Sequence, residues 1–269
     1  MNTGWSEALA AGSTVYDLAQ PLAASTPTSP NHPGFRMALT RRHGDMVRAD
    51  GSSAASELIV TGGHVGTHVD ALAHVSYRGL LHGGIAADEA QRGGRFARLG
   101  IDEMAPVVCR GVLLDVPAVH GSDVLPAAYP INADDLQAAA DRGVELRCGD
   151  AALIRTGWAR HVDNATAYLG HESGVPGPTE QAARWLVERG VRVTGADTIA
   201  YEHIPAGAGH SLLPVHRLLL VEHGIHIVEV MNLEQIAAAG VCEFLFILAP
   251  LKIVGATGSP VRPLAVVTP

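Results

Sequence analysis

Four residues that can bind a metal ion or carry a proton lie within eleven positions of this sequence. The segment HVGTHVDALAH contains His64, His68, Asp70 and His74, with a glycine and a threonine between the first two histidines. Each of these side chains is costly to bury unless it is paired, hydrogen-bonded or bound to a metal. Their concentration in one segment therefore indicates a chemical site.

Two imidazoles and one carboxylate make a set of three protein ligands. A divalent ion held by three protein ligands keeps a position open for water, which is typical of catalytic sites, whereas structural zinc has four protein ligands. The mixed nitrogen and oxygen donors suit Zn²⁺, Mn²⁺ or Fe²⁺. Such an ion acidifies water and polarises a carbonyl group, which is the chemistry of hydrolysis. The remaining histidine, His74, is then available as a base or acid.

No single regular element can bring the four side chains together. On a helix, Asp70 would lie roughly opposite His68. On a strand all four would share one face, but His64 and His74 would be ~33 Å apart at ~3.3 Å per residue. We therefore expect a buried strand over Glu57–Gly63 that breaks at its final glycines, bends at Gly66-Thr67 and enters a helical turn.

The rest of the chain alternates between strand-like and helix-like patterns, which predicts a layered α/β core in one domain spanning residues 1–269. Residues 1–50 are rich in Pro, Gly and Ser, and we expect an N-terminal arm with one short strand, contacting a neighbour or a second subunit. The predicted strands are 111–116, 151–158, 191–197, 225–230 and 243–248, with two more in the segment 251–267. The predicted helices are 132–143, 178–190, 215–224 and 232–240, with Asn132 as an N-cap and Pro178 as an opening residue.

Composition narrows the class of protein. Apolar residues make up 47% and charged residues 17%, with a formal net charge of −8, so neither nucleic acid nor an anionic membrane is an expected partner. The three cysteines are scattered and form no metal knuckle, and the N-terminus does not resemble a signal peptide. The most apolar segment, 244–256, contains a proline and a lysine and is too short to span a bilayer. A cytoplasmic location is expected.

The motif HVGTHVDALAH resembles the HxGTHxDxxxH signature of the cyclase-like metal hydrolases, which include bacterial kynurenine formamidases and isatin hydrolases. The resemblance extends over most of the chain, through RTGW at 155–158, GVPGPTEQAARWLVERGVRVTGADT, PVHRLLLVEHGIHIVE and LKIVGATGSPVRP. Kynurenine formamidases usually have proline where this chain has Leu72. The long N-terminal region, together with RRHGD and LHGG, is more similar to isatin hydrolases.

The resemblance implies a swivelling, layered α/β/β-type cyclase-like fold, assembled as a homodimer or larger oligomer. It implies that His64, His68 and Asp70 bind the metal and that His74 is the general base or proton shuttle. Formamidase-like members bind a second metal through a later histidine and glutamate, and His216 and Glu229 occupy the matching segments. Isatin-hydrolase-like members use one manganese ion, so one Mn²⁺ is expected, with Zn²⁺ as the alternative. His216 and Glu229 then either form a second site or orient a ligand.

Three further features have both a functional and a structural interpretation. Trp158 follows a predicted buried strand and could form the wall of a pocket for a flat aromatic substrate, or simply pack in the core. His82 in LLHGG could contact substrate or stabilise a turn. The segment GATGSP lacks the GK[ST] of a phosphate-binding loop and is better explained as a hairpin turn.

The expected function is metal-dependent hydrolysis of a C–N bond in a small aromatic amide, with the cyclic amide of isatin opened to isatinate. An arylformamidase that hydrolyses N-formylkynurenine with two metals is the alternative within the family. A small-molecule-binding protein on the same scaffold is the alternative outside enzyme chemistry. Metal stoichiometry and assays on both substrates separate these possibilities.

Overall fold

A computed structural model describes residues 12–268 of the chain. Within this range, nine strands form one mixed sheet in the order β1-β15-β13-β7-β9-β11-β12-β4-β14. The parallel centre is β7 (Val107–Asp115), β9 (Ala151–Arg155), β11 (Val193–Ala196) and β12 (His226–Glu229). The antiparallel flanks are β1 (Thr14–Asp17), β15 (Leu264–Val267) and β13 (Glu243–Leu248) on one side, and β4 (His68–Asp70) and β14 (Gly258–Pro260) on the other.

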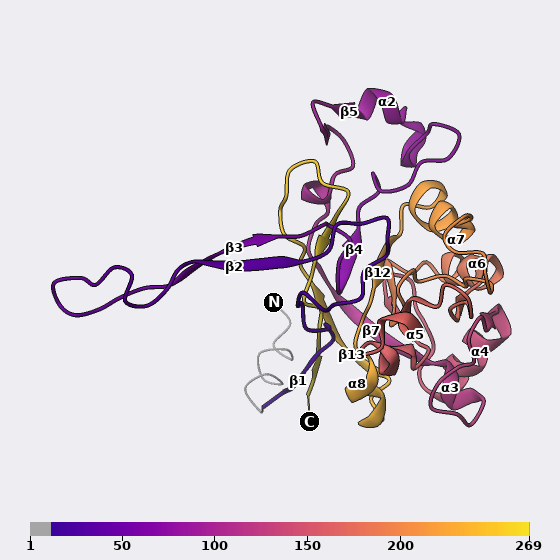
Figure 1. Cartoon of the computed structure of the whole chain (residues 1–269). Helices are drawn as coiled ribbons and strands as arrows, with labels where there is room; N and C mark the ends of the chain where they lie inside the picture. Colours follow the sequence, from indigo (N-terminus) through magenta and orange to yellow (C-terminus); the bar gives the residue numbers. More distant parts are fainter. Residues whose placement is uncertain (1–11, 269) are drawn as a thin grey trace, which may run out of the picture.

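Helices cover one face of the parallel centre (Figure 1). Helix α4 (Ala133–Arg142) begins as expected at Asn132, whose backbone N–H donates to Asp135 across the first turn at 2.9 Å. Helix α6 (Glu180–Glu188) is capped by Thr179 rather than opened by Pro178, which lies in the short strand β10 (Gly177–Pro178). The other α-helices of the described residues are α2 (Ala87–Ala90), α3 (Val116–Val119), α5 (Ala165–Leu169), α7 (Pro214–His216) with the π-helix Arg217–Glu222, and α8 (Glu234–Ala238). Short 3₁₀ helices are formed by His82–Gly84, Ile101–Glu103 and Trp158–His161.

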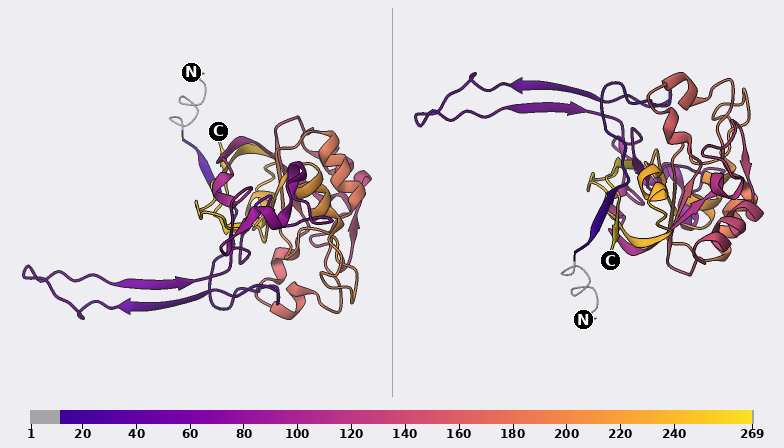
Figure 2. Two further views of the ribbon diagram at one scale, coloured as in Figure 1. Left: turned by 90° about the horizontal axis from the view of Figure 1, so that it is seen from above. Right: turned by 90° about the horizontal axis from the view of Figure 1, so that it is seen from below.

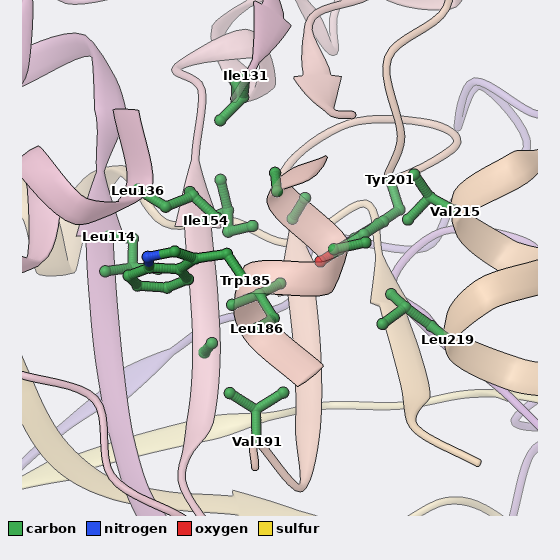
Figure 3. Packing of buried hydrophobic residues seen from close by; sticks show 14 of the residues in the cluster. Leu114, Ile131, Leu136, Ile154, Trp185, Leu186, Val191, Tyr201, Val215 and Leu219 are labelled. Carbon is green, nitrogen blue, oxygen red and sulfur yellow. The ribbon is translucent and has the colours of Figure 1, made fainter. Parts of the chain in front are cut away.

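Strand β9 and residues 111–114 of β7 are buried on both faces, which explains the apolar sequences of these segments. Leu114 and Ile154 point toward the helices and pack with Leu136, Trp185 and Leu186 (Figure 3). Leu113 and Leu153 point to the opposite face, where the curled sheet brings strands β13 and β15 and helix α8 over them. Two apolar clusters, one on each side of the sheet, therefore hold the strands that carry the site.

The apolar segment 57–60 forms a strand, as expected, but the prediction that it is buried is wrong. Among the described residues, β3 (Ser56–Val60) pairs only with β2 (Arg36–Arg41), and this hairpin projects far from the body of the molecule (Figures 1 and 2). Leu58, Ile59 and Val60 are each more than half exposed. Runs of apolar residues occur both in core strands and in exposed strands, so the run alone does not predict burial. The projecting segment is thus residues 36–60, and the N-terminal strand β1 belongs to the main sheet.

The glycine-rich segment GATGSP is not a hairpin turn, contrary to expectation. Its last three residues form β14, which pairs with β4 at one edge of the sheet, whereas the next strand, β15, pairs with β1 and β13 near the other edge. Only residues 261–263 connect the two strands, so the curled sheet brings its two edges close together here, and β14 and β15 do not pair as a hairpin. Across residues 12–268, no helix is both long enough and apolar enough to cross a membrane.

Candidate metal centre and active site

Strand β4 places the central part of the histidine motif between two other strands. It pairs with β12 on one side and β14 on the other, and the chain bends into it at Gly66, which has a φ of +62°. The predicted bend is present. It leads into a short strand, not directly into a helical turn, because β12 and β14 both offer backbone partners to residues 68–70. A turn then follows, in which the backbone N–H of His74 donates to the Ala71 carbonyl at 2.9 Å.

The three histidines of the motif gather around Asp70. Nδ1 of His64 donates to Asp70 Oδ1 at 2.8 Å, and Nε2 of His64 lies 2.9 Å from Thr257 Oγ1. Nδ1 of His68 donates to the Gly66 carbonyl at 2.8 Å, which leaves Nε2 facing Asp70 Oδ1 at 3.6 Å. The ring of His74 stacks on the ring of His64 with centroids 3.9 Å apart.

His216 and Glu229 join the same cluster from the other half of the chain. Nε2 of His216 lies 3.0 Å from Glu229 Oε1 and 3.6 Å from Asp70 Oδ2, and Nε2 of His68 lies 3.3 Å from Glu229 Oε2. Two sets of potential metal ligands result, His64–Asp70–His74 and Asp70–His216–Glu229. Asp70 belongs to both sets, so the structure connects the sequence motif to the later histidine and glutamate.

The arrangement fits a divalent cation. Asp70 Oδ2 is a buried oxygen that has no hydrogen-bond partner among the described residues. Tetrahedral ligands at 2.0–2.2 Å from one ion are separated by about 3.4 Å from each other. The contacts of His68 with Asp70 and Glu229, at 3.6 and 3.3 Å, match that spacing better than they match strong hydrogen bonds. Imidazole and carboxylate donors are also the mixed set that Mn²⁺ and Zn²⁺ accept.

The cluster has the charge pattern of a cation site. Burial acts to raise the pKa of Asp70, but His74 and the hydrogen bond from His64 outweigh burial and hold that pKa well below its ordinary range. Burial likewise acts against ionisation of Glu229, yet the hydrogen bonds from His216 and His68 lower its pKa to about 2. Both carboxylates are therefore ionised at neutral pH, deep in the protein, where they attract positive charge.

The histidines of the cluster differ in proton affinity. Burial lowers the pKa of His74 to about 4, so its ring is neutral at pH 7 and can accept a proton. Burial acts in the same direction on His68 and His216, but their carboxylate partners, Glu229 for both and Glu202 for His216, raise the pKa of each ring. A proton on those two rings would occupy the place where a cation can bind.

A small cavity of about 50 Å³, room for several water molecules, opens beside the cluster. Sequence reasoning had identified five of its lining residues: His64, His68, His74, His216 and Glu229. It missed the others, which are Ser29, His32, Ile199, Ala200, His210 and Leu213. His32 lies over His64 with ring centroids 4.9 Å apart. The one signal for His32 and His210 was the high number of histidines, 14 in the chain.

Trp158 and His82, the two expected substrate contacts, do not line this cavity. Trp158 is buried, donates from Nε1 to the Tyr168 carbonyl at 2.9 Å, and packs in a cluster with Ile199 and Ala200. His82 lies against the π-helix, where its Nδ1 donates to the Val221 carbonyl at 3.0 Å. Trp158 therefore stands behind the cavity wall, and His82 stabilises a loop contact.

Comparison with known sequences identifies the family that has this fold and this histidine–carboxylate centre. The family model described as putative cyclase matches residues 16–203, and the chain belongs to this family. An isatin hydrolase from Roseibium aggregatum is 29% identical over 223 residues, covering 81% of this chain and 77% of that protein.

Solved structures of the same fold agree with this assignment. A crystal structure described as a novel cyclase has a TM-score of 0.85 and 28% identity, covering 98% of this chain and 93% of its own. Isatin hydrolase A from Ralstonia solanacearum has a TM-score of 0.75 and 28% identity, covering 98% of this chain and 96% of its own. The family and these relatives support a hydrolase of the cyclase-like family, and the donor cluster indicates a divalent metal.

Proposed function

We propose that this protein hydrolyses the C–N bond of a small aromatic amide, and that isatin, opened to isatinate, is its substrate. The observation that carries the proposal is the set of buried donors around Asp70, next to a neutral His74 and open to a cavity. The identity of the substrate is supported by the similarity to isatin hydrolases over most of the chain.

In this proposal His64, His68 and Asp70 hold one divalent ion, Mn²⁺ by preference and Zn²⁺ as the alternative. When bound, the ion would supply Lewis acidity for the substrate carbonyl and lower the pKa of water. Asp70 anchors the set, because its carboxylate is ionised and contacts donors on both sides. Both ring nitrogens of His64 contact protein atoms, Nδ1 with Asp70 and Nε2 with Thr257, so metal binding would replace one of these two contacts.

His74 is proposed to move the proton. Hydrolysis adds water to the amide carbon, breaks the C–N bond and transfers a proton to the leaving nitrogen. With a pKa of about 4, the neutral His74 ring can take the proton from water at pH 7 and return it to that nitrogen. The stacked His64 ring limits the orientations of His74. A weak base can be effective when the protein holds it beside the reacting groups, because no diffusional encounter is then needed.

The aromatic part of the substrate is proposed to contact the apolar side of the cavity. Ile199, Ala200 and Leu213 supply that side, whereas the histidines and Glu229 supply the polar side. Trp158 belongs to the same buried apolar cluster as Ile199 and Ala200 and would help to support this wall. A cavity with one apolar wall and one wall of donors suits a flat ring that carries an amide.

An arylformamidase acting on N-formylkynurenine is the second candidate. The observation in its favour is the second donor set, Asp70–His216–Glu229, which could hold a second ion. Elemental analysis of the purified protein, followed by absorbance assays on isatin and N-formylkynurenine in parallel, distinguishes the two. One ion per chain with isatin turnover supports the first proposal, and two ions with formamide turnover support the second.

Removal of metal tests both enzyme proposals against the binding-protein alternative. Dialysis against a chelator should abolish hydrolysis, and Mn²⁺ or Zn²⁺ should restore it. Turnover that survives complete removal of metal would contradict metal-dependent hydrolysis. A metal-loaded protein that binds isatin but turns over neither substrate would indicate the non-enzymatic function.

We also propose that the β2–β3 arm packs against a second copy of this chain. Both faces of the hairpin are apolar, because Met37 is paired with Ile59 and Ala38 with Leu58, and a two-stranded hairpin is marginally stable alone. The arm points away from its own body (Figure 2). The arm carries four arginines and three acidic residues, so it is slightly positive, whereas the whole chain has a net charge of −8. The negative body of another copy would therefore attract the arm.

The body offers an apolar surface for such an arm. A groove on the sheet is lined by Val108, Phe244, Leu245 and Val266, and Val108 is 60% exposed. In a two-fold symmetric dimer, the arm of each copy would lie in the groove of the other copy, so both arms and both grooves would be covered.

The three cysteines are free, which fits a reducing compartment. We propose that the protein is located in the cytoplasm.

A further inference from the structure

Glu202 is a buried carboxylate that lies outside the cavity and contacts one of the cluster histidines from behind. It is 1% exposed and follows β11 in the loop that leads to Ile204. Its Oε1 accepts hydrogen bonds from the backbone N–H of His216 at 3.0 Å and from Nδ1 of the same ring at 2.6 Å. Its Oε2 accepts from the backbone N–H of Val215 at 3.1 Å.

These bonds determine which nitrogen of His216 faces the cluster. An ionised carboxylate only accepts hydrogen bonds, so Nδ1 must carry the hydrogen of the 2.6 Å bond. Nε2 is then the nitrogen directed at Glu229 and Asp70, at 3.0 and 3.6 Å. A histidine can bind a metal only through a nitrogen that carries no proton, so the tautomer and the ring angle both matter.

We infer that Glu202 is a positioning residue, which holds the His216 ring in the orientation and tautomer needed to bind a cation together with Asp70 and Glu229. The inference rests on the proposed metal-dependent function in the form in which the second donor set, Asp70–His216–Glu229, also binds a cation. A carboxylate behind a metal-binding histidine typically changes metal affinity by about 10- to 100-fold. Glu202 also bonds two backbone N–H groups at the start of α7, so a purely structural role is the competing explanation.

Glu202→Gln separates the two explanations when it is compared with Tyr201→Phe. The glutamine retains the shape of the side chain but removes its charge, and its amide cannot accept at all three N–H groups. Tyr201 is the neighbouring residue, equally buried, and its hydroxyl bonds Thr194 at 2.8 Å without contacting His216. Both variants lose a buried hydrogen bond, but only Glu202→Gln changes the environment of His216.

The experiment measures Mn²⁺ affinity of the metal-stripped, full-length protein by calorimetric titration, together with the thermal unfolding midpoint. We expect Glu202→Gln to bind Mn²⁺ about 10- to 100-fold more weakly than the wild type. Tyr201→Phe should lower the unfolding midpoint but keep its affinity within about twofold, since it leaves the ligands in place. Equal affinity of the wild type and Glu202→Gln, or equal loss in both variants, would overturn the inference.

A second measurement applies even if Glu202→Gln fails to fold. In ¹⁵N-histidine spectra of the wild-type protein with diamagnetic Zn²⁺ bound, His216 should be protonated at Nδ1 and not at Nε2. The opposite tautomer would overturn the inference. If the wild type binds neither Mn²⁺ nor Zn²⁺, the proposed function itself fails. If the wild type binds metal and only the Glu202 results disagree, the proposed function stands and the positioning role is lost.

Discussion

His68 and Glu229 are directly opposite each other on the antiparallel strands β4 and β12, with Nε2 of His68 3.3 Å from Oε2 of Glu229. These residues are 161 positions apart in the sequence. Their pairing joins the compact histidine motif to the C-terminal half of the chain. It also puts two carboxylates, Asp70 and Glu229, within reach of the same imidazole.

The first prediction concerns His68. His68→Ala should bind Mn²⁺ at least about tenfold more weakly than the wild type, which is the scale for residues that merely support a ligand. The reason is that His68 Nε2 faces both carboxylates of the cluster. Elemental analysis after gel filtration measures the retained metal. An alanine variant that keeps a full complement of metal would exclude His68 as a ligand.

The second prediction separates proton transfer from metal binding. His74→Ala should retain its metal but lose about 10²- to 10⁴-fold in turnover, the usual contribution of a general base. Metal content and turnover are measured on the same preparation. His43→Ala is a suitable control, because His43 is exposed and lies on the arm. Loss of metal from His74→Ala would instead identify His74 as a ligand, since its ring belongs to one of the two donor sets.

The third prediction concerns Gly258, which packs against the His64 ring. A Cβ at this position would lie 2.6 Å from His64 Cε1, too close for any side chain. Gly258→Ala should therefore displace the imidazole and weaken Mn²⁺ binding by about tenfold or more. Gly34→Ala is the matched control, because its Cβ would meet no atom closer than 3.4 Å. Calorimetric titration compares the two variants, and identical affinities would show that the position of His64 does not matter.

The fourth prediction concerns stability and pH at an ion pair away from the cluster. Burial acts to raise the pKa of Glu234, but Arg155 and Arg160 outweigh burial and lower it from its ordinary value of 4.5. A carboxyl group with a lowered folded-state pKa stabilises the protein above its unfolded-state pKa and loses this effect as pH falls through the folded-state value. The contribution of Glu234 should therefore be complete at pH 7 and decline below about pH 4.5.

Glu234→Gln should lower the free energy of unfolding by about 1–3 kcal/mol at pH 7, since Arg155 is buried and loses a charged partner. The difference from the wild type should shrink as the pH falls below 4.5. Urea unfolding at several pH values measures it. Glu243→Gln is the control, because Glu243 is half exposed and 3.6 Å from Arg110, and it should change stability by less than about 0.5 kcal/mol. A pH-independent difference would contradict the assignment.

The fifth prediction tests the arm. Ile59→Asp combined with Leu58→Asp places charge on both faces of the hairpin, and should convert a dimer into a monomer. Sedimentation should then give the 28.0 kDa mass of one chain. Leu212→Asp alters an exposed leucine outside the arm and should leave the mass unchanged. If wild-type and arm variants sediment alike, the arm has another partner or none.

The sequence correctly predicted those helices and strands that are indicated by neighbouring residues, such as capping residues and apolar runs. Helix α4 begins at Asn132 and ends before Gly143, as the capping residues indicate, and strands β7 and β9 lie where the apolar runs do. Segment 57–60 shows the limit of this reasoning, because its apolar residues form a strand of the arm and not of the core. The segment GATGSP shows it again, since glycine indicates a change of direction but not which strands will pair.

By itself, the sequence determined the chemistry available: three histidines and an aspartate in a segment that bends at glycine, and a family signature that covers them. Only the tertiary structure decided which distant groups join them. Sheet pairing brings Glu229 opposite His68, and the start of β14 with the preceding Thr257 lies against His64. Glu202 reaches His216 through the loop after β11. Local patterns fix side-chain types and backbone preferences, whereas strand order depends on the packing of the whole core, and strand order selects the partners of Asp70.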